Sequence, residues 1–187
     1  MIDYIVLFLA WSIYLFLHST LASSKVKQLQ PFSAKHYRLL YSIISTLGLI
    51  LLVYLMALVD PHYFYAPTDS VRYVGMVLSS WGVILIIGSF RNISTKSFLG
   101  LKEEKENRLV RTGLHSRMRH PIYTGTILLL VGMFVAVPSA TVLVSTATIF
   151  LYLPIGIYLE EKKLIEEFGD DYLKYKREVK SLFPGLF

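Results

Sequence analysis

The sequence contains no cysteine among its 187 residues. Disulfides, cysteine-ligated metals and thiol nucleophiles are therefore excluded. The sequence is also poor in charge: 17% of the residues are charged, whereas 54% are hydrophobic, and the mean hydropathy is +0.53. Soluble domains are typically about 45–50% apolar even when glycine is counted. The composition therefore indicates an integral membrane protein.

A basic stretch is missing from the N-terminus, which reads Met-Ile-Asp-Tyr, and Trp11 and His18 interrupt the apolar run that follows. A cleaved signal peptide has a positively charged start before a short apolar core. We therefore expect the first apolar segment to stay in the protein as a membrane span.

Five apolar runs approach the length of about 20 residues that a helix needs to cross a bilayer. They cover residues 3–22, 40–59, 71–90, 121–137 and 139–159. Pro138 and Ser139 separate the last two runs, which we expect to form a tight hairpin. Pro154 lies inside the fifth run and is expected to kink it. The sequence thus predicts one all-α membrane domain, residues 1–187, with five transmembrane helices.

The cationic residues gather on one side of the predicted bundle. Of the 19 Lys and Arg residues, 4 lie between the first two spans, 8 in residues 91–120 and 6 beyond residue 159. Five spans place these three segments on the same face, and loops rich in Lys and Arg stay in the cytoplasm. The N-terminus is therefore predicted outside and the C-terminus in the cytoplasm. The net charge of +6 then reflects orientation rather than nucleic-acid binding.

A cationic stretch stands directly before the fourth apolar run, with Arg117, Arg119 and His120 followed by Pro121. Proline suits the first turn of a helix. The free N–H groups and the positive dipole end of that helix would lie beside these cations, which makes an anion site. The alternative is that the arginines extend to lipid phosphates and that His120 only caps the helix.

Two carboxylates, Glu160 and Glu161, stand where the fifth span leaves the membrane. The hairpin would bring them close to the cationic stretch at the start of the fourth span. A zwitterionic ligand, with one carboxylate and one ammonium, would satisfy both groups. The alternative is that the glutamates only pair with nearby Lys or Arg, which contributes about 0–1 kcal/mol for an exposed pair.

The tail after the fifth span predicts two further features. The helix is expected to continue beyond the bilayer until Gly169. Asp170 is then expected to cap a short amphipathic helix that carries Tyr172, Tyr175 and Val179 on one face.

Two histidines, His18 and His36, lie near the cytoplasmic end of the first span. Imidazoles ligate haem and metals, but no histidine–glutamate spacing of the zinc type occurs in the sequence. We favour hydrogen bonding of His18 within the bundle and predict no metal site.

The C-terminal half carries a combined motif. It consists of Gly113-Leu-His-Ser-Arg-Met-Arg-His-Pro-Ile-Tyr-Thr-Gly and, after a hairpin, Glu160-Glu161 followed by Leu164, Phe168-Gly169, Tyr172 and Tyr175. With this spacing the chain resembles the integral-membrane methyltransferases, which include the isoprenylcysteine carboxyl methyltransferases and the phospholipid N-methyltransferases. The resemblance covers about residues 97–185. The N-terminal half, through Trp11 to His18, is similar to the methanethiol S-methyltransferase branch and to accessory membrane proteins of nitrite and nitric-oxide reductase.

The resemblance implies S-adenosylmethionine as cofactor, bound at the cytoplasmic ends of the last two spans. The cofactor-binding residues that it implies are Gly113, His115, His120, Pro121, Tyr123, Glu160, Glu161, Tyr175 and Arg177. Gly113 and His115 would wrap the adenosine, Glu160 or Glu161 would hold the ammonium or ribose, and Tyr175 with Arg177 would close the pocket. The family commonly has an aromatic residue at the position of His115.

The function implied is methyl transfer to a lipophilic or small thiol or carboxylate acceptor that enters from the bilayer, with Arg119 and Glu161 as catalytic residues. Residues 1–90 would supply three spans and residues 91–187 the cofactor-binding half. The absence of eukaryotic targeting signals favours a prokaryotic plasma membrane. Two alternatives are a non-catalytic membrane accessory or transport module and a sterol-reductase-like enzyme that uses a reduced nicotinamide nucleotide.

Overall fold

The computed structural model describes residues 1–29, 31, 33–92 and 108–184, and this part of the chain is helical apart from connections and one isolated bridge. The elements are α1 (Ile2–Ala22), α2 (Ser24–Leu29), α3 (Ala34–Leu58), α4 (Asp69–Ser89), η1 (Phe90–Asn92), η2 (Gly113–Ser116), α6 (Pro121–Ala136), α7 (Ala140–Phe168) and α8 (Asp170–Glu178). The predicted all-α class is confirmed.

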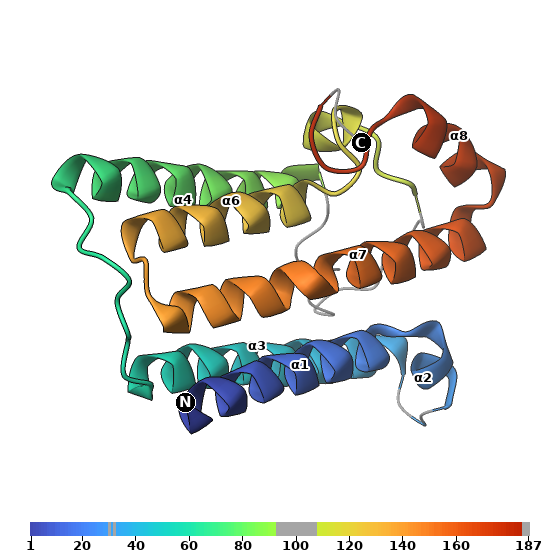
Figure 1. Ribbon diagram of the computed structural model, residues 1–187. Coiled ribbons are helices and arrows are strands. Elements are labelled where there is room, and N and C mark those ends of the chain that lie inside the picture. Colours follow the sequence, from blue (N-terminus) through green and yellow to red (C-terminus); the bar gives the residue numbers. More distant parts are fainter. Residues whose placement is uncertain (30, 32, 93–107, 185–187) are drawn as a thin grey trace.

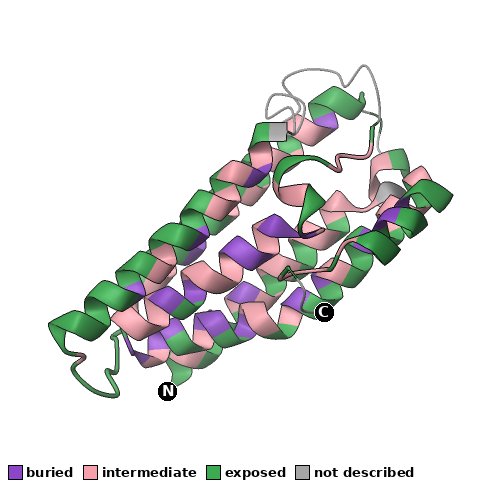
Figure 2. Ribbon diagram, turned by 90° about the horizontal axis from the view of Figure 1, so that it is seen from above, coloured by how far each residue is buried: buried purple, intermediate pink, exposed green. Residues whose placement is uncertain are grey.

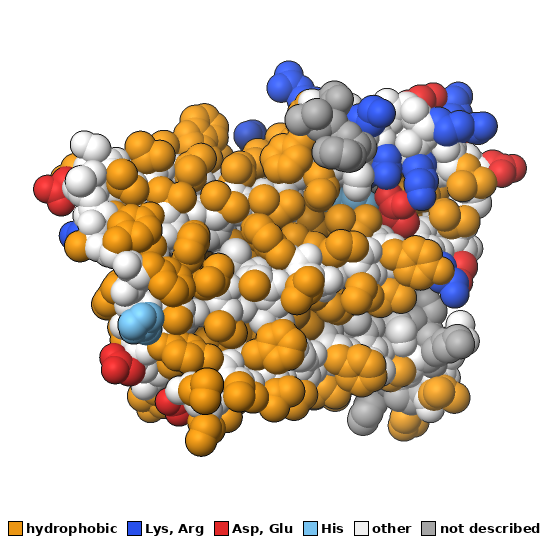
Figure 3. Space-filling model, viewed as in Figure 1, with side chains coloured by type: hydrophobic (Ala, Val, Ile, Leu, Met, Phe, Trp, Pro, Cys, Tyr) orange, Lys and Arg blue, Asp and Glu red, His pale blue; other side chains and the backbone are white. Residues whose placement is uncertain are grey.

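Four helices, α1, α3, α4 and α7, are long and apolar enough to cross a membrane. Helix α6 has 16 residues, a length of about 24 Å at about 1.5 Å per residue, whereas the hydrocarbon core is about 30 Å thick. Large apolar side chains such as Leu47, Ile50 and Trp81 are exposed, and Figure 3 shows apolar surface over most of the bundle. These helices support a membrane protein. That α6 also crosses the membrane stays a prediction.

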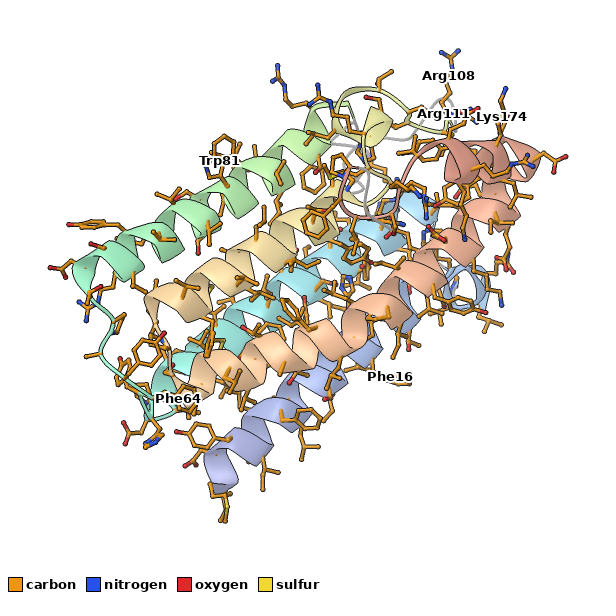
Figure 4. All side chains as sticks on the ribbon, turned by 45° about the horizontal axis from the view of Figure 1, so that its top comes forward. Phe16, Phe64, Trp81, Arg108, Arg111 and Lys174 are labelled. Atoms are coloured by element: carbon orange, nitrogen blue, oxygen red, sulfur yellow. The ribbon has the colours of Figure 1, made fainter. Side chains whose placement is uncertain are left out.

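The helices lie in layers, with α4 and α6 side by side, α7 next to α6, and α1 and α3 on the far side of α7 (Figure 1). Buried positions concentrate on α6 and α7, in the middle of this arrangement (Figure 2). The short helices α2 and α8 lie at the same end of the bundle. We call this end the basic end, because Arg108, Arg111 and Lys174 surround it (Figure 4).

Glycines bring α4 and α6 into backbone contact. A Cβ atom on Gly82 would lie 2.5 Å from the carbonyl oxygen of Gly125, and one on Gly75 would lie 2.6 Å from that of Gly132. The contacts also show that the two helices are antiparallel. Small residues at such positions let membrane helices pack closely, and the Ser79 hydroxyl donates across the seam to the Leu129 carbonyl at 3.1 Å. The main packing partner of α6 is therefore α4, although α7 follows α6 in the chain.

The other layer packs around Leu7, Trp11 and Leu52, which join α1 to α3 and α7. The Trp11 indole donates to the Ser145 hydroxyl of α7 at 3.0 Å in a buried hydrogen bond. This bond provides a partner for the one polar atom of the indole, as a buried tryptophan requires.

A three-residue connection, 137–139, joins α6 to α7 as the predicted hairpin requires. The Ser139 side chain caps α7 by accepting from the Val142 N–H, and the Phe64 N–H donates to the Pro138 carbonyl at 2.9 Å. Pro154 lies within the continuous helix α7.

Two sequence expectations about helix starts are wrong. Helix α3 begins at Ala34 rather than near residue 40, because the Ser33 side chain accepts from the His36 N–H and caps an earlier, polar first turn. Gly169, with φ of 54°, occupies the cap position of α8, so Asp170 is the first helical residue and makes no capping hydrogen bond. Gly169 is suited to this left-handed conformation because it has no Cβ atom.

Candidate functional site

The candidate site lies at the basic end, where the start of α6, the last turns of α7, helix α8 and the following segment meet. Glu161 of α7 is at its centre. Its Oε1 accepts from the Arg119 Nε at 2.9 Å, and its Oε2 accepts from the Lys176 ammonium at 2.6 Å. The side chains of Glu161 and Arg119 retain only 10% and 9% exposure. Burial and two cationic partners make this carboxylate a fixed anionic centre.

Arg119 is held by more than its carboxylate partner. Its Nη1 donates to the backbone carbonyls of Lys176 and Val179, at 3.2 Å for Lys176. Its backbone N–H donates to the Lys180 carbonyl at 2.8 Å, and the His120 N–H donates to the Ser181 carbonyl at 3.0 Å. The segment that follows α8 is therefore hydrogen-bonded, through its backbone, to the two residues that precede α6.

His120 bridges the two glutamates. Its Nε2 lies 3.2 Å from Glu161 Oε1, and its Nδ1 lies 3.5 Å from Glu160 Oε2. Burial disfavours the charged imidazole, but the hydrogen bonds to both glutamates outweigh burial, so the pKa of His120 is raised. Glu160 differs from Glu161, because its side chain is 47% exposed. Glu160 is thus the carboxylate with room for another partner.

The turn before α6 is tied to α8. Gly113 begins η2 with a positive φ of 64°, and the Tyr175 hydroxyl donates to the His115 carbonyl at 2.6 Å. The Arg111 guanidinium lies 5.8 Å from the Tyr175 ring centre, a distance typical of a cation–π contact. Burial raises the pKa of Tyr175 to about 12. Burial lowers the pKa of His115, although Glu160 opposes this shift.

Two buried polar atoms at the site have no hydrogen-bond partner among the described residues. They are the Tyr172 hydroxyl and Nδ1 of His115. Tyr172 is only 1% exposed, and burial together with the charge of Glu161 raises the pKa of its hydroxyl. An unpaired buried hydroxyl costs about 1–3 kcal/mol. Both atoms therefore stay unsatisfied in the described part of the chain.

The structure brings together most of the residues that the sequence singled out. Tyr123 lies in the first turn of α6, two residues after Pro121, and its ring centre is 5.6 Å from that of His120. Arg177 differs, since it is exposed on α8 and has no ion pair within the described part of the chain. The roles assigned to these residues stay predictions.

Lys176, rather than its neighbour Arg177, is the α8 cation that contacts the site. The sequence contained a signal for it. Residues three and four apart share a helix face, so a face that contains Tyr172 and Tyr175 also contains Lys176.

His18 forms hydrogen bonds inside the bundle, as favoured from the sequence. Its Nδ1 lies 3.1 Å from the Ser45 hydroxyl, and its Nε2 lies 3.0 Å from the Tyr41 hydroxyl. His36 is separate, with its Nδ1 2.6 Å from the Ser33 hydroxyl.

The family model described as NnrU protein matches residues 6–182. The chain is 31% identical over 182 residues to the methanethiol S-methyltransferase of Pseudomonas deceptionensis, which covers 90% of this chain and 68% of that protein. It is 30% identical over 180 residues to methanethiol S-methyltransferase 1 of Bradyrhizobium diazoefficiens, and this match covers 89% of this chain and 62% of that protein. The chain is also 32% identical over 79 residues to the protein-S-isoprenylcysteine O-methyltransferase of Saccharomyces cerevisiae. This match covers 42% of this chain and 33% of that protein. No solved structure shows a significant match.

The apolar helices and the charged cluster at their end define a helical membrane protein with a candidate site at one end of its bundle. The chain belongs to the NnrU protein family. Its named relatives confirm the predicted resemblance to the integral-membrane methyltransferases and support a methyltransferase. The chain spans 68% and 62% of the lengths of the two methanethiol S-methyltransferases.

Proposed function

We propose that this protein is an S-adenosylmethionine-dependent membrane methyltransferase whose methyl donor binds at the basic end. The observation that carries the proposal is the convergence of Arg119, His120 and Lys176 on Glu161, with Glu160 half-exposed beside them. A donor of this type supplies an electrophilic methyl group on a sulfonium and carries a zwitterionic amino-acid end. The protein must then align donor and acceptor and exclude water.

The residues present fit such a donor. Glu160 contacts His120 at 3.5 Å and interacts with Tyr123, but its side chain stays 47% exposed, so its carboxylate suits an ammonium group. The unpaired Tyr172 hydroxyl and His115 Nδ1 supply two further polar contacts. Arg111 and Lys174, both at the basic end (Figure 4), offer positive charge for a carboxylate. In this proposal, Gly113, Pro121, Tyr123, Tyr175 and Arg177 also border the donor, and Arg119 holds the Glu161 carboxylate in place.

The proposal includes a topology and an acceptor class. The chain would form one membrane domain with five spans, of which α6 is the fourth along the chain, with the N-terminus outside a prokaryotic plasma membrane and the basic end in the cytoplasm. The acceptor would be a small thiol that reaches the donor from the bilayer. The names of two relatives, methanethiol S-methyltransferases, support a thiol acceptor.

Calorimetric titration of the detergent-purified protein with S-adenosylhomocysteine tests the donor site. Saturable binding is expected, weakened about tenfold or more in Glu160→Gln and in Tyr172→Phe. The second variant is informative because it removes a hydroxyl that has no partner in the described structure, so the fold should not lose stability. Glu166→Gln, an exposed glutamate on α7, is the matched control and should bind normally.

Two results would contradict the proposal. A folded parent protein that binds no S-adenosylhomocysteine would exclude the donor site. Thermal protection by a reduced nicotinamide nucleotide, without protection by S-adenosylhomocysteine, would support the sterol-reductase-like alternative. Methyl transfer from radiolabelled donor to ethanethiol then tests the acceptor class.

A further inference from the structure

A second group of polar side chains lies deeper in the bundle, between α1, α3, α6 and α7. We call it the hydroxyl–imidazole cluster, and its members are Tyr14, His18, Ser19, Tyr41, Ser45, Tyr123 and Tyr152. All seven side chains are partly buried rather than sealed in the core. Polar side chains inside membrane spans are costly and usually serve a function. The cluster therefore calls for a role beyond packing.

His18 is fixed in orientation at the centre of the cluster. Ser45 lies 3.1 Å from its Nδ1, and the Tyr41 hydroxyl lies 3.0 Å from its Nε2. The Tyr14 ring stacks on the imidazole, with the ring centres 5.9 Å apart, and the Tyr14 hydroxyl donates to the Ser45 carbonyl at 3.1 Å. The imidazole is thus held between α1 and α3, with the Tyr41 hydroxyl 3.0 Å from its Nε2 and 3.2 Å from its Nδ1.

The cluster continues through α7 to the candidate donor site. The Ser19 hydroxyl is hydrogen-bonded to the Tyr152 hydroxyl. The Tyr152 ring and the Tyr123 hydroxyl both lie against Gly156, where a Cβ atom would come within 3.1 Å of Tyr152 Cε1 and 3.3 Å of the Tyr123 hydroxyl. Tyr123 in turn interacts with the carboxylate of Glu160. Tyr123 therefore belongs both to the candidate donor site and to the hydroxyl–imidazole cluster, so the two sites are adjacent.

The composition of the cluster favours one class of acceptor. Its seven members include no carboxylate, which an amine acceptor would need as a partner, and no Lys or Arg, which a carboxylate acceptor would need. Hydroxyls and a neutral imidazole both accept and donate hydrogen bonds. This set suits a small neutral S–H group.

We propose that the hydroxyl–imidazole cluster is the acceptor site of the proposed methyltransferase and that His18 takes up the proton of a small thiol bound there. The inference rests on the proposed function. A cysteine thiol has an ordinary pKa of about 8.5, and a simple alkyl thiol is less acidic still, so the acceptor is mostly protonated at neutral pH and must lose its proton on methylation. A sulfur lone pair forms the new bond to the methyl carbon, and the methyl–sulfonium bond breaks with its electron pair left on the donor sulfur. The thiol proton passes through the Tyr41 hydroxyl to Nε2 of His18.

Thiol binding can be tested without any methyl donor. The full chain is labelled with ¹³C-histidine and held in detergent micelles, and its histidine NMR resonances are followed while the thiol is added. Ethanethiol is the probe. We expect a saturable shift of one histidine resonance, which His18→Gln removes and His36→Gln does not. His36 is the matched control because it is exposed and, among the described residues, its ring is hydrogen-bonded to Ser33 at the start of α3.

Kinetics with ethanethiol then separate a chemical role from a structural one. General base catalysis contributes about 10²–10⁴-fold, so His18→Gln should lower kcat about 100-fold or more. Tyr152→Phe, which removes a hydroxyl from the wall of the site, should raise KM several-fold. Both variants should bind S-adenosylhomocysteine as the parent does, since neither side chain contacts Glu160, Glu161 or His120 in the described structure.

The outcomes distinguish the inference from the proposed function. If the parent methylates ethanethiol but the His18 resonance does not move, or if His18→Gln keeps the parent kcat, the inference is wrong and the methyltransferase proposal stands. If the parent binds no S-adenosylhomocysteine and methylates no thiol, the proposed function fails and the inference falls with it.

Discussion

The carboxylate of Glu161 lies 2.6 Å from the ammonium of Lys176, so the last long helix and the short helix after it are joined by an ion pair. Gly169 reverses the chain between them with a positive φ. The same carboxylate contacts Arg119 at the start of α6. One buried anion therefore holds three elements of the site together.

Replacement of Glu161 by alanine should destabilise the protein strongly. It would leave Arg119, which is 9% exposed, without its counter-charge, and removing one partner of a buried pair costs about 3–5 kcal/mol. Lys176→Met should cost less, because that side chain is 42% exposed. The thermal unfolding midpoint in detergent measures both. Equal midpoints for Glu161→Ala and the exposed control Glu166→Ala would contradict the prediction.

The glycine seam predicts a steric effect. A Cβ atom at Gly82 would meet backbone atoms of α6 at 2.5 Å, whereas one at Gly88 would meet, among the described residues, a methyl group of Leu114 at 3.2 Å. Gly82→Ala should force α4 and α6 apart and destabilise by about 1–3 kcal/mol, as overpacking does. Gly88→Ala is the matched control and should be nearly neutral. Unfolding midpoints compared in one detergent test the difference, and equal values for the two variants would refute it.

His120 predicts a dependence of stability on pH. Its pKa is raised in the folded protein because the contacts with Glu160 and Glu161 outweigh burial. The charged imidazole therefore stabilises the fold below its ordinary value of about 6.5, and this contribution is lost as the pH rises through the raised pKa. His115, whose pKa is lowered by burial, acts in the opposite direction.

The comparison of the parent protein with His120→Gln isolates the contribution of protonated His120 to stability. The difference between their unfolding midpoints should be larger at about pH 5.5 than at about pH 9. A difference that stays constant over this range would show that protonated His120 does not stabilise the fold.

We predict that the amine of Lys27 on α2 is unusually reactive. Its pKa is lowered to about 8 because burial and the nearby cations Lys163 and Arg38 disfavour the ammonium form. An ordinary lysine has a pKa of about 10.4, so Lys27 should be the faster to react with formaldehyde and borohydride at about pH 8. Peptide mass spectrometry measures the rates. Lys174, exposed on α8, is the reference. Lys163→Gln should slow the reaction at Lys27, and an equal rate at Lys27 and Lys174 would contradict the prediction.

Hydropathy predicted α1, α4 and α7 to within a few residues, apart from the extension of α7, which the tail pattern indicated. It did not predict the start of α3, because the first turn of that helix is polar and depends on the Ser33 cap. It also did not predict that α6 packs mainly on α4, since apolar runs specify burial but not the partner. The spacing of Gly75 with Gly82 and of Gly125 with Gly132 carries that information.

The site was predictable where charge clusters flank apolar runs. Arg119, His120 and Glu161 stood out for that reason, and the short hairpin brings them together. The choice between Lys176 and Arg177 depended on helix register, which motif matching alone did not use. The unpaired hydroxyl of Tyr172 and the cluster around His18 depend on contacts between distant segments, so only the structure reveals them.

The bonding of Lys180 and Ser181 to Arg119 and His120 constrains how the protein is made. The start of α6 leaves the ribosome more than 60 residues before its partners do, and the Thr124 hydroxyl later donates to the Leu182 carbonyl as well. The spans can therefore enter the bilayer during translation, while the charged centre is assembled only after residues 176–182 have been synthesised. A nascent chain arrested before Leu182 would be inserted but incomplete at the site.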